Sequence, residues 1–129
     1  MKLYRKMFAA PDGKPAVGSG RNMLGVRPAD PAQPRQAADV SAAIGTDGVA
    51  PGEGLSVFND PATIPFQVQG EVWVIDTQEL PPELEAHQRG KKQGHYHLEP
   101  SSAVNLDELQ ALLAGTRDLW KKADGGTTS

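Results

Sequence analysis

The sequence predicts a single α+β domain over residues 1–124, followed by a frayed tail at 125–129. Three observations predict this class. Several short segments alternate apolar and polar residues as strands do, one capped amphipathic helix closes the chain, and strands and helices follow one another in mixed order. The hydrophobic fraction of 38% and the aromatic fraction of 5% predict one small, mostly aliphatic core.

The first predicted strand covers residues 2–8, and the turn-forming Pro11-Asp12-Gly13 closes it. Its alternation separates two faces, with Leu3, Arg5 and Met7 on one and Tyr4, Lys6 and Phe8 on the other. Residues 11–54 hold 14 of the 25 prolines and glycines and no aromatic residue. Residues 11–53 are therefore predicted to be a long loop, with room for a short helix near Arg35 to Ile44.

Strands are predicted again at residues 54–58, 68–76 and 94–98. Between the last two, Pro81-Pro82 with Glu83 and Glu85 behind them predict a short helix, since prolines and acids favour a first helical turn. Asn105 and Glu108 have the spacing of a capping box. The leucines behind them recur at helical spacing, which predicts an amphipathic helix over residues 106–122.

Composition excludes several classes of protein. The net charge of −3 argues against a protein that binds polyanions over a broad surface, although a small basic pocket remains compatible with it. The absence of cysteine excludes disulfides, cysteine-based zinc sites and a thiol nucleophile. No apolar run predicts a signal peptide or a membrane span, so secretion would need a dedicated machine.

Candidate site residues come from three strands. Arg5 is a charged residue on an otherwise apolar strand face, where it either reaches the sheet edge or meets an anion. Ser56 needs a hydrogen-bond partner if it faces inward, and it could orient a catalytic side chain. Glu99 precedes Pro100 at a strand end, from which a carboxylate can project into a cleft.

His95 and His97 share one face of their predicted strand, with Tyr96 and Leu98 on the other. Three interpretations stay open from the residues alone. The histidines could form half of a metal site whose other ligands are not visible, or the proton-transfer pair of a metal-independent ribonuclease assisted by Lys91 and Lys92. They could also lie on a solvated strand face.

Three segments in order resemble one family: LYRKMF (3–8), GEGLSVFNDPATIP (52–65) and VWVIDTQELPPELEAHQRGKKQGHYHLEP (72–100). The closing DLWKKA fits as well. These segments are similar to small antibacterial effector toxins of type VI secretion systems whose fold is like that of ADP-ribosyltransferases. The resemblance implies two small curved antiparallel sheets around a cleft that holds NAD⁺, with a C-terminal amphipathic helix.

The resemblance also implies roles for individual residues. Arg5 and Ser56 fall on the arginine and serine positions of the arginine-serine-glutamate branch, where the first binds phosphate or ribose and the second braces the site. Cofactor contacts are expected from Tyr4, Arg5, Tyr96 and His97, with either tyrosine as the side chain that stacks on nicotinamide. The third, acidic position of that branch has no clear equivalent in this sequence, so either Glu99 or His95 is expected to take it. The expected catalytic residues are therefore Arg5, Ser56, His95 and Glu99.

A toxin of this family is expected to transfer ADP-ribose from NAD⁺ to an acceptor, or to hydrolyse NAD⁺, in the cytoplasm of a target cell. A component of a contact-dependent secretion machine would carry it there without a signal peptide. A cognate immunity protein would protect the producing cell. The alternative functions are a ribonuclease toxin that uses His95 and His97, and a non-catalytic binding module.

Overall fold

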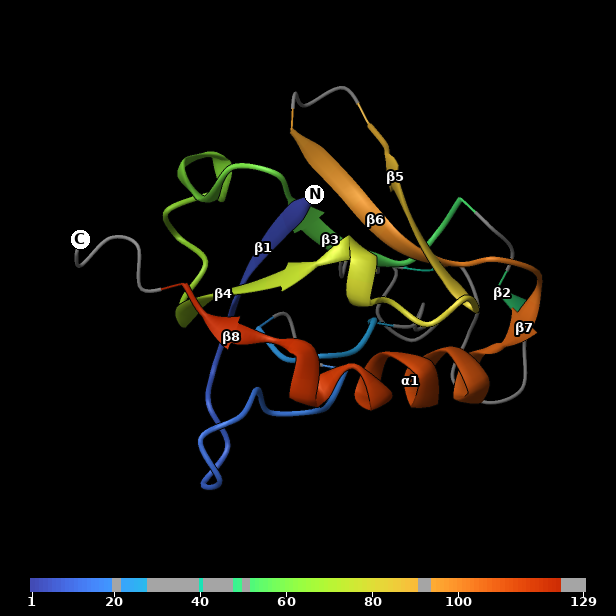
Figure 1. Ribbon diagram of the computed structural model, residues 1–129, viewed down its shortest axis with the longest axis horizontal. Helices are drawn as coiled ribbons and strands as arrows, with labels where there is room; N and C mark the ends of the chain where they lie inside the picture. The colour runs from blue at the N-terminus through green and yellow to red at the C-terminus, as the bar shows by residue number, and fades with distance from the viewer. Residues whose placement is uncertain (20–21, 28–39, 41–47, 50–51, 91–93, 124–129) are drawn as a thin grey trace, which may run out of the picture.

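The computed structural model describes residues 1–19, 22–27, 40, 48–49, 52–90 and 94–123. In these residues the chain forms an α+β structure with a six-stranded antiparallel sheet and one α-helix, as the sequence predicts (Figure 1). No helix in the described part of the chain is both long enough and apolar enough to cross a membrane.

The sheet has the strand order β5-β6-β3-β1-β4-β8. Its strands are β1 (Lys2–Met7), β3 (Leu55–Phe58), β4 (Glu71–Asp76), β5 (Leu84–Gln88), β6 (His95–Pro100) and β8 (Lys121–Lys122). Where two small sheets are expected around a cleft, the described residues instead form this one sheet, and the second sheet is only a two-stranded ladder. That ladder consists of β2 (Gly48–Val49) and β7 (Val104–Asn105).

The helix α1 (Leu106–Gly115) lies along one side of the sheet (Figure 1). Its buried residues Leu106, Leu109 and Leu113 pack into one cluster with the apolar sheet face, to which Leu3, Met7, Leu55, Val57, Trp73, Ile75 and Leu98 belong. Apolar side chains at every second strand position therefore form the core with one helical stripe.

The predicted helix behind Pro81-Pro82 is wrong, because Leu84–Gln88 is the edge strand β5. Its residues pair with β6, and Leu84 and Ala86 pack on the core while Glu85 and His87 face solvent. The predicted helix over 106–122 is correct only as far as Gly115. A 3₁₀ helix, η3 (Arg117–Leu119), follows it, and Lys121–Lys122 pairs with β4. Two further 3₁₀ helices are η1 (Pro61–Thr63) and η2 (Thr77–Glu79).

The long loop predicted for residues 11–53 contributes to the core. Leu24, Val26, Val40 and Val49 are buried in the same cluster as the sheet. The backbone N–H and carbonyl of Val26 both pair with the side-chain amide of Gln110 on α1, which ties the loop to the helix. Most of the helix suggested near Arg35 to Ile44 lies outside the described residues.

Removing the helix cap is expected to destabilise the protein. The Asn105 side chain accepts from the Glu108 N–H at 2.8 Å, and the Glu108 carboxylate accepts from the Asn105 N–H. We expect Asn105→Ala to lower the free energy of unfolding by about 1 kcal/mol, measured by urea denaturation. Ser102→Ala, which changes an exposed residue just before the helix, should leave the midpoint unchanged. Equal midpoints for all three proteins would show that the cap contributes nothing.

Candidate functional site

The strands β1, β3 and β6, which carry Arg5, Ser56 and His95, are adjacent in the sheet. The strands β3 and β6 pair over four residues each, from Leu55 with Leu98 to Phe58 with His95. In contrast, β1 and β3 pair at a single registered position, Tyr4 with Phe58. The strands β1 and β3 therefore separate beyond this position, and the space between them lies next to Arg5 and Ser56.

Arg5 connects the two strands where their pairing ends. It is 7% exposed, and its Nη1 donates to the Ser56 carbonyl at 2.9 Å. Its Nε and Nη2 donate to the Met23 carbonyl at 3.2 and 2.9 Å. The guanidinium thus supplies a donor to a strand carbonyl that a continuous ladder would satisfy from the backbone of β1. Its role includes holding β1, β3 and the loop around Met23 together.

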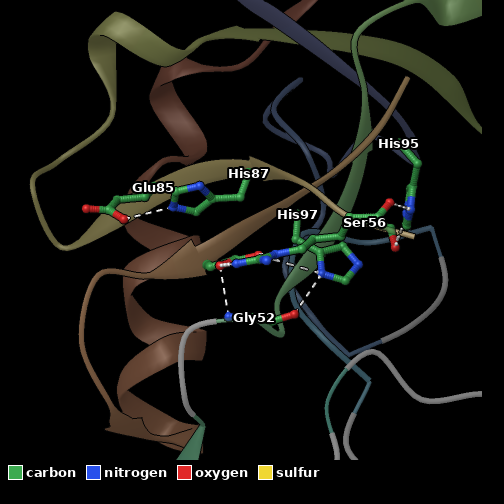
Figure 2. Close-up of polar contacts among 8 residues, drawn as sticks. Gly52, Ser56, Glu85, His87, His95 and His97 are labelled. Carbon is green, nitrogen blue, oxygen red and sulfur yellow. Dashed lines mark hydrogen bonds and ion pairs between the residues drawn. The ribbon is translucent and has the colours of Figure 1, made fainter. Parts of the chain in front are cut away.

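The Ser56 hydroxyl meets the His95 ring (Figure 2). The distance from Ser56 Oγ to His95 Nε2 is 3.1 Å, and His95 Nδ1 lies 3.1 Å from the carbonyl oxygen of Arg89. A carbonyl can only accept, so Nδ1 carries a proton. In the neutral ring, Nε2 then has a free electron pair, which accepts the Ser56 O–H. The Ser56 hydroxyl, the His95 imidazole and the Arg89 carbonyl thus form a chain of two hydrogen bonds.

Aromatic contacts orient the His95 ring further. The ring centroids of Phe58 and His95 are 5.2 Å apart, and those of His95 and His97 are 5.0 Å apart in an edge-to-face arrangement. The Nδ1 atom of His97 lies 3.3 Å from the Gly52 carbonyl. The two histidines share one strand face, as predicted, but their ring nitrogens face different partners. His87 on β5 lies opposite His97, and its Nε2 contacts Glu85 (Figure 2).

Glu99 lies in a separate, closed network. Its side chain is fully buried, and Arg89 donates to both carboxylate oxygens, from Nε at 2.5 Å and from Nη2 at 2.9 Å. The Gly52 N–H donates to Oε1 at 2.8 Å, and His97 Nδ1 lies 4.0 Å from Oε2. This carboxylate anchors the segment before β3 to β6. It is engaged in these bonds and does not line the pocket beside Ser56.

The charge of Glu99 is stabilised by its surroundings. Burial alone would raise its pKa, but the hydrogen bond from Arg89, the bond from the Gly52 N–H and the charge of Arg89 outweigh burial and hold the pKa below its ordinary value. The carboxylate is thus the buried member of an ion pair whose other member, Arg89, is partly exposed. Such a residue acts as a structural anion and not as a proton donor at neutral pH.

A pocket opens where β1 and β3 separate. Its cavity volume is about 150 Å³. Three of its lining residues are cationic and the others are Ser56 and apolar side chains, namely Arg5, Lys6, Arg27, Phe58, Ile64, Pro65 and Val68. Among the described residues none of those that line it is a carboxylate. A protein of net charge −3 therefore has a locally cationic pocket.

The other predicted contact residues are divided between the two faces of the sheet. Tyr4 is paired with Phe58 and shares its side of the sheet. Tyr96 packs against the core on the opposite side from His95, so it does not meet the Ser56 hydroxyl. His97 binds the segment before β3 through Gly52. The structure thus brings Arg5, Ser56 and His95 together and separates Tyr96 and Glu99 from them.

Sequence reasoning missed Lys6, Arg27 and Phe58 as pocket residues and Arg89 as the partner of Glu99. Lys6 was visible as a charge next to Arg5 in a strand, but no local pattern marked Arg27 or Arg89. Lys91 and Lys92, suggested as helpers of a ribonuclease, lie outside the described residues.

No protein-family model, no curated protein and no solved structure matches this chain. The function is therefore inferred from the geometry of the site.

Proposed function

We propose that this protein is an antibacterial toxin that consumes NAD⁺. It would cleave the bond between nicotinamide and ribose, and transfer ADP-ribose to an acceptor or to water. The observation that carries this proposal is the cationic pocket between β1 and β3, which has a serine and a phenylalanine in its wall. Phosphates are bound by lysine and arginine, and rings are bound by apolar and aromatic walls.

The size of the pocket fits one ring of a dinucleotide. A cavity of about 150 Å³ admits a single six-membered ring, as engineered cavities of that volume bind benzene. Phe66 lies on the loop whose neighbours Pro65 and Val68 form one wall, and it is 91% exposed. It offers a stacking surface for a second ring outside the cavity.

The chain's own residues would then have distinct tasks. Lys6 and Arg27 would bind the pyrophosphate, and Arg5 would keep β1 and β3 at the spacing the pocket needs while adding its charge. Holding both phosphates and one ring converts a flexible substrate into an oriented one. NAD⁺ is the substrate here, and its nicotinamide is the leaving group.

The order of strands supports a sheet of the ADP-ribosyltransferase kind. The segments that carry the resemblance form β1, β3, β4, β5 and β6, which follow one another in the sheet in the order β5-β6-β3-β1-β4. The single registered pair between β1 and β3 gives an open place in the sheet, as a fold that binds its substrate in a cleft requires. The split form of that fold is part of the proposal.

The biological setting belongs to the same proposal. The protein would be exported by a contact-dependent machine and would act in the cytoplasm of a target cell. A cognate immunity protein would bind over the cationic pocket in the producing cell, which favours an acidic or neutral partner surface. A pull-down from producing cells that finds no tightly bound small protein would contradict this part.

Replacing the pocket cations is expected to weaken the reaction. We expect Lys6→Ala and Arg27→Ala each to lower kcat/KM for nicotinamide release roughly 10- to 150-fold, since a charge-assisted bond is worth roughly 1.5–3 kcal/mol. Lys121→Ala removes an exposed cation on the far edge strand β8 and should change nothing. Unchanged kinetics in both pocket variants would exclude this pocket as the binding site.

A second candidate function is a ribonuclease, favoured by the 5.0 Å separation of the His95 and His97 rings on one strand face. One experiment separates the two. Susceptible cells that express the chain would be followed for NAD⁺ and for RNA integrity together. Loss of NAD⁺ with intact RNA supports the proposal, whereas RNA breakdown with unchanged NAD⁺ supports the ribonuclease. Killing that leaves both unchanged would favour the non-catalytic binding module.

A further inference from the structure

We propose that Ser56 is a nucleophile and that His95 is its general base, an inference that rests on the proposed function for its natural substrate. The Ser56 Oγ lies 3.1 Å from His95 Nε2, and Ser56 also lines the cationic pocket. A nucleophile within hydrogen-bond reach of a base, with the base oriented by a third group, is the arrangement that activates serine in enzymes. Here the third group is the Arg89 carbonyl.

The carbonyl decides which nitrogen is the base. His95 Nδ1 can only donate to the Arg89 oxygen, so the neutral ring presents its electron pair at Nε2. The contacts with Phe58 and His97 restrict rotation of the ring. A serine that needed only a hydrogen-bond partner would not require a base whose tautomer and orientation are both set.

The lining of the pocket gives a reason for a covalent step, because it offers no described carboxylate to stabilise positive charge on the ribose. Cleavage of the bond to nicotinamide leaves positive charge on the ribose, which a nearby carboxylate commonly stabilises. The described residues around the pocket include no carboxylate, and Glu99 is held by Arg89. A covalent bond from Ser56 Oγ would remove that charge in another way, while the cations of the pocket hold the phosphates.

The proposed reaction has two steps at C1′ of the ribose. Ser56 Oγ attacks C1′ of the ribose, and its proton passes to His95 Nε2. The Oγ–C1′ bond forms as the C1′–N bond breaks, and the electron pair of that bond leaves with neutral nicotinamide. In the second step the oxygen of water or of a hydroxyl acceptor attacks C1′ as the C1′–Oγ bond breaks. The protonated His95 returns its proton to Ser56 Oγ, and the proton of the acceptor passes to water. Two displacements at C1′ retain the original configuration.

The first test measures Ser56 without NAD⁺. Purified protein would be treated with diisopropyl fluorophosphate, which loses fluoride as a P–Oγ bond forms on an activated serine. We expect one label per chain on Ser56, located by peptide mass spectrometry. His95→Asn keeps a side-chain N–H that can donate to Arg89 and removes the base, so labelling should slow about 100-fold or more.

Matched controls make this test specific. His87→Asn changes an exposed histidine on β5, and Ser102→Ala changes an exposed serine; both variants should label at the parental rate. Labelling spread over several serines, or a rate unaffected by His95→Asn, would overturn the assignment of an activated Ser56. Thermal melting of each variant shows whether it is folded.

The second test reads the stereochemistry at C1′. The protein would turn over NAD⁺ in buffer that contains methanol, and the anomer of the methyl product would be determined by NMR. A covalent Ser56 intermediate gives a methyl product with the β configuration that NAD⁺ has at C1′. Direct attack by methanol gives the α-anomer of that product. Ser56→Ala should lose turnover by about 100-fold or more.

The two tests separate the inference from the proposed function. Specific labelling of Ser56 without any nicotinamide release would overturn NAD⁺ as the substrate and support the nucleophile. Nicotinamide release with the α-anomer, or with full turnover by Ser56→Ala, would support NAD⁺ and overturn the nucleophile.

Discussion

Arg5→Ala is expected to lower the free energy of unfolding by about 2–6 kcal/mol. The variant leaves two carbonyls, those of Ser56 and Met23, without the charged donor that Arg5 supplies. A buried acceptor left without a partner costs roughly 1–3 kcal/mol. The loss is large beside a total stability of about 5–15 kcal/mol. The midpoint of urea denaturation measures it.

Two variants control for this effect. Arg5→Lys keeps a charged donor but lacks the planar group that reaches two carbonyls, so its loss should be smaller than that of alanine. Lys6→Ala changes a neighbouring strand residue with its side chain on the other face, and it should shift the midpoint by less than about 1 kcal/mol. A midpoint for Arg5→Ala equal to the parent's would show that these bonds do not stabilise the fold.

The result also determines how assays of the proposed activity are interpreted. The resemblance implies that alanine at Arg5 abolishes activity by removing a phosphate ligand. The structure gives a second cause, because the same guanidinium joins β1 to β3. Only a variant that stays folded at the assay temperature reports on binding, so Lys6→Ala and Arg27→Ala are the sharper probes of the pocket.

The loss of folding stability at acid pH is expected to depend on Glu99. Its folded pKa lies below the ordinary value of 4.5, so the unfolded chain binds its proton first as the pH falls. The stabilisation is therefore fully present above about pH 5 and is lost as the pH falls from 4.5 through the folded pKa. Glu99→Gln removes this dependence and should lower stability at pH 7 by about 1–3 kcal/mol.

Urea denaturation at several pH values between 3 and 7 tests this, with the parent and the variant compared at each pH. The difference in unfolding free energy should shrink towards acid. Glu85→Gln is the matched control, because Glu85 pairs with Glu99 across β5 and β6 but is exposed. A difference that stays constant over the whole range would show that Glu99 is not charged in the folded state.

Local pattern predicted much of the sheet. The alternation of His95 and His97 with Tyr96 and Leu98 gave the correct two faces of β6, and the capping box marked the correct helix start. The error at Leu84–Gln88 has a physical cause. Proline and glutamate favour a helix start locally, but backbone pairing with β6 and the burial of Leu84 and Ala86 favour a strand.

The site was less predictable because its geometry is non-local. A sequence shows that Ser56 and His95 are polar residues in strands, but their 3.1 Å contact depends on the β3–β6 register, in which Ser56 pairs with His97. The partner of Glu99 is likewise set by the pairing of β5 with β6, which brings Arg89 next to it. Charge spacing along the chain does not encode such pairs, so Glu99 could not be distinguished from a catalytic acid.

The central position of β1 has a consequence for synthesis. This strand is made before β3 and β4, yet it lies between them, and its main partner begins only at Glu71. A nascent chain that has not yet released residues 71–76 from the ribosome therefore holds an unpaired first strand and no assembled pocket. The sheet should therefore form late and in one step, so chains truncated before β6 are expected to remain unfolded.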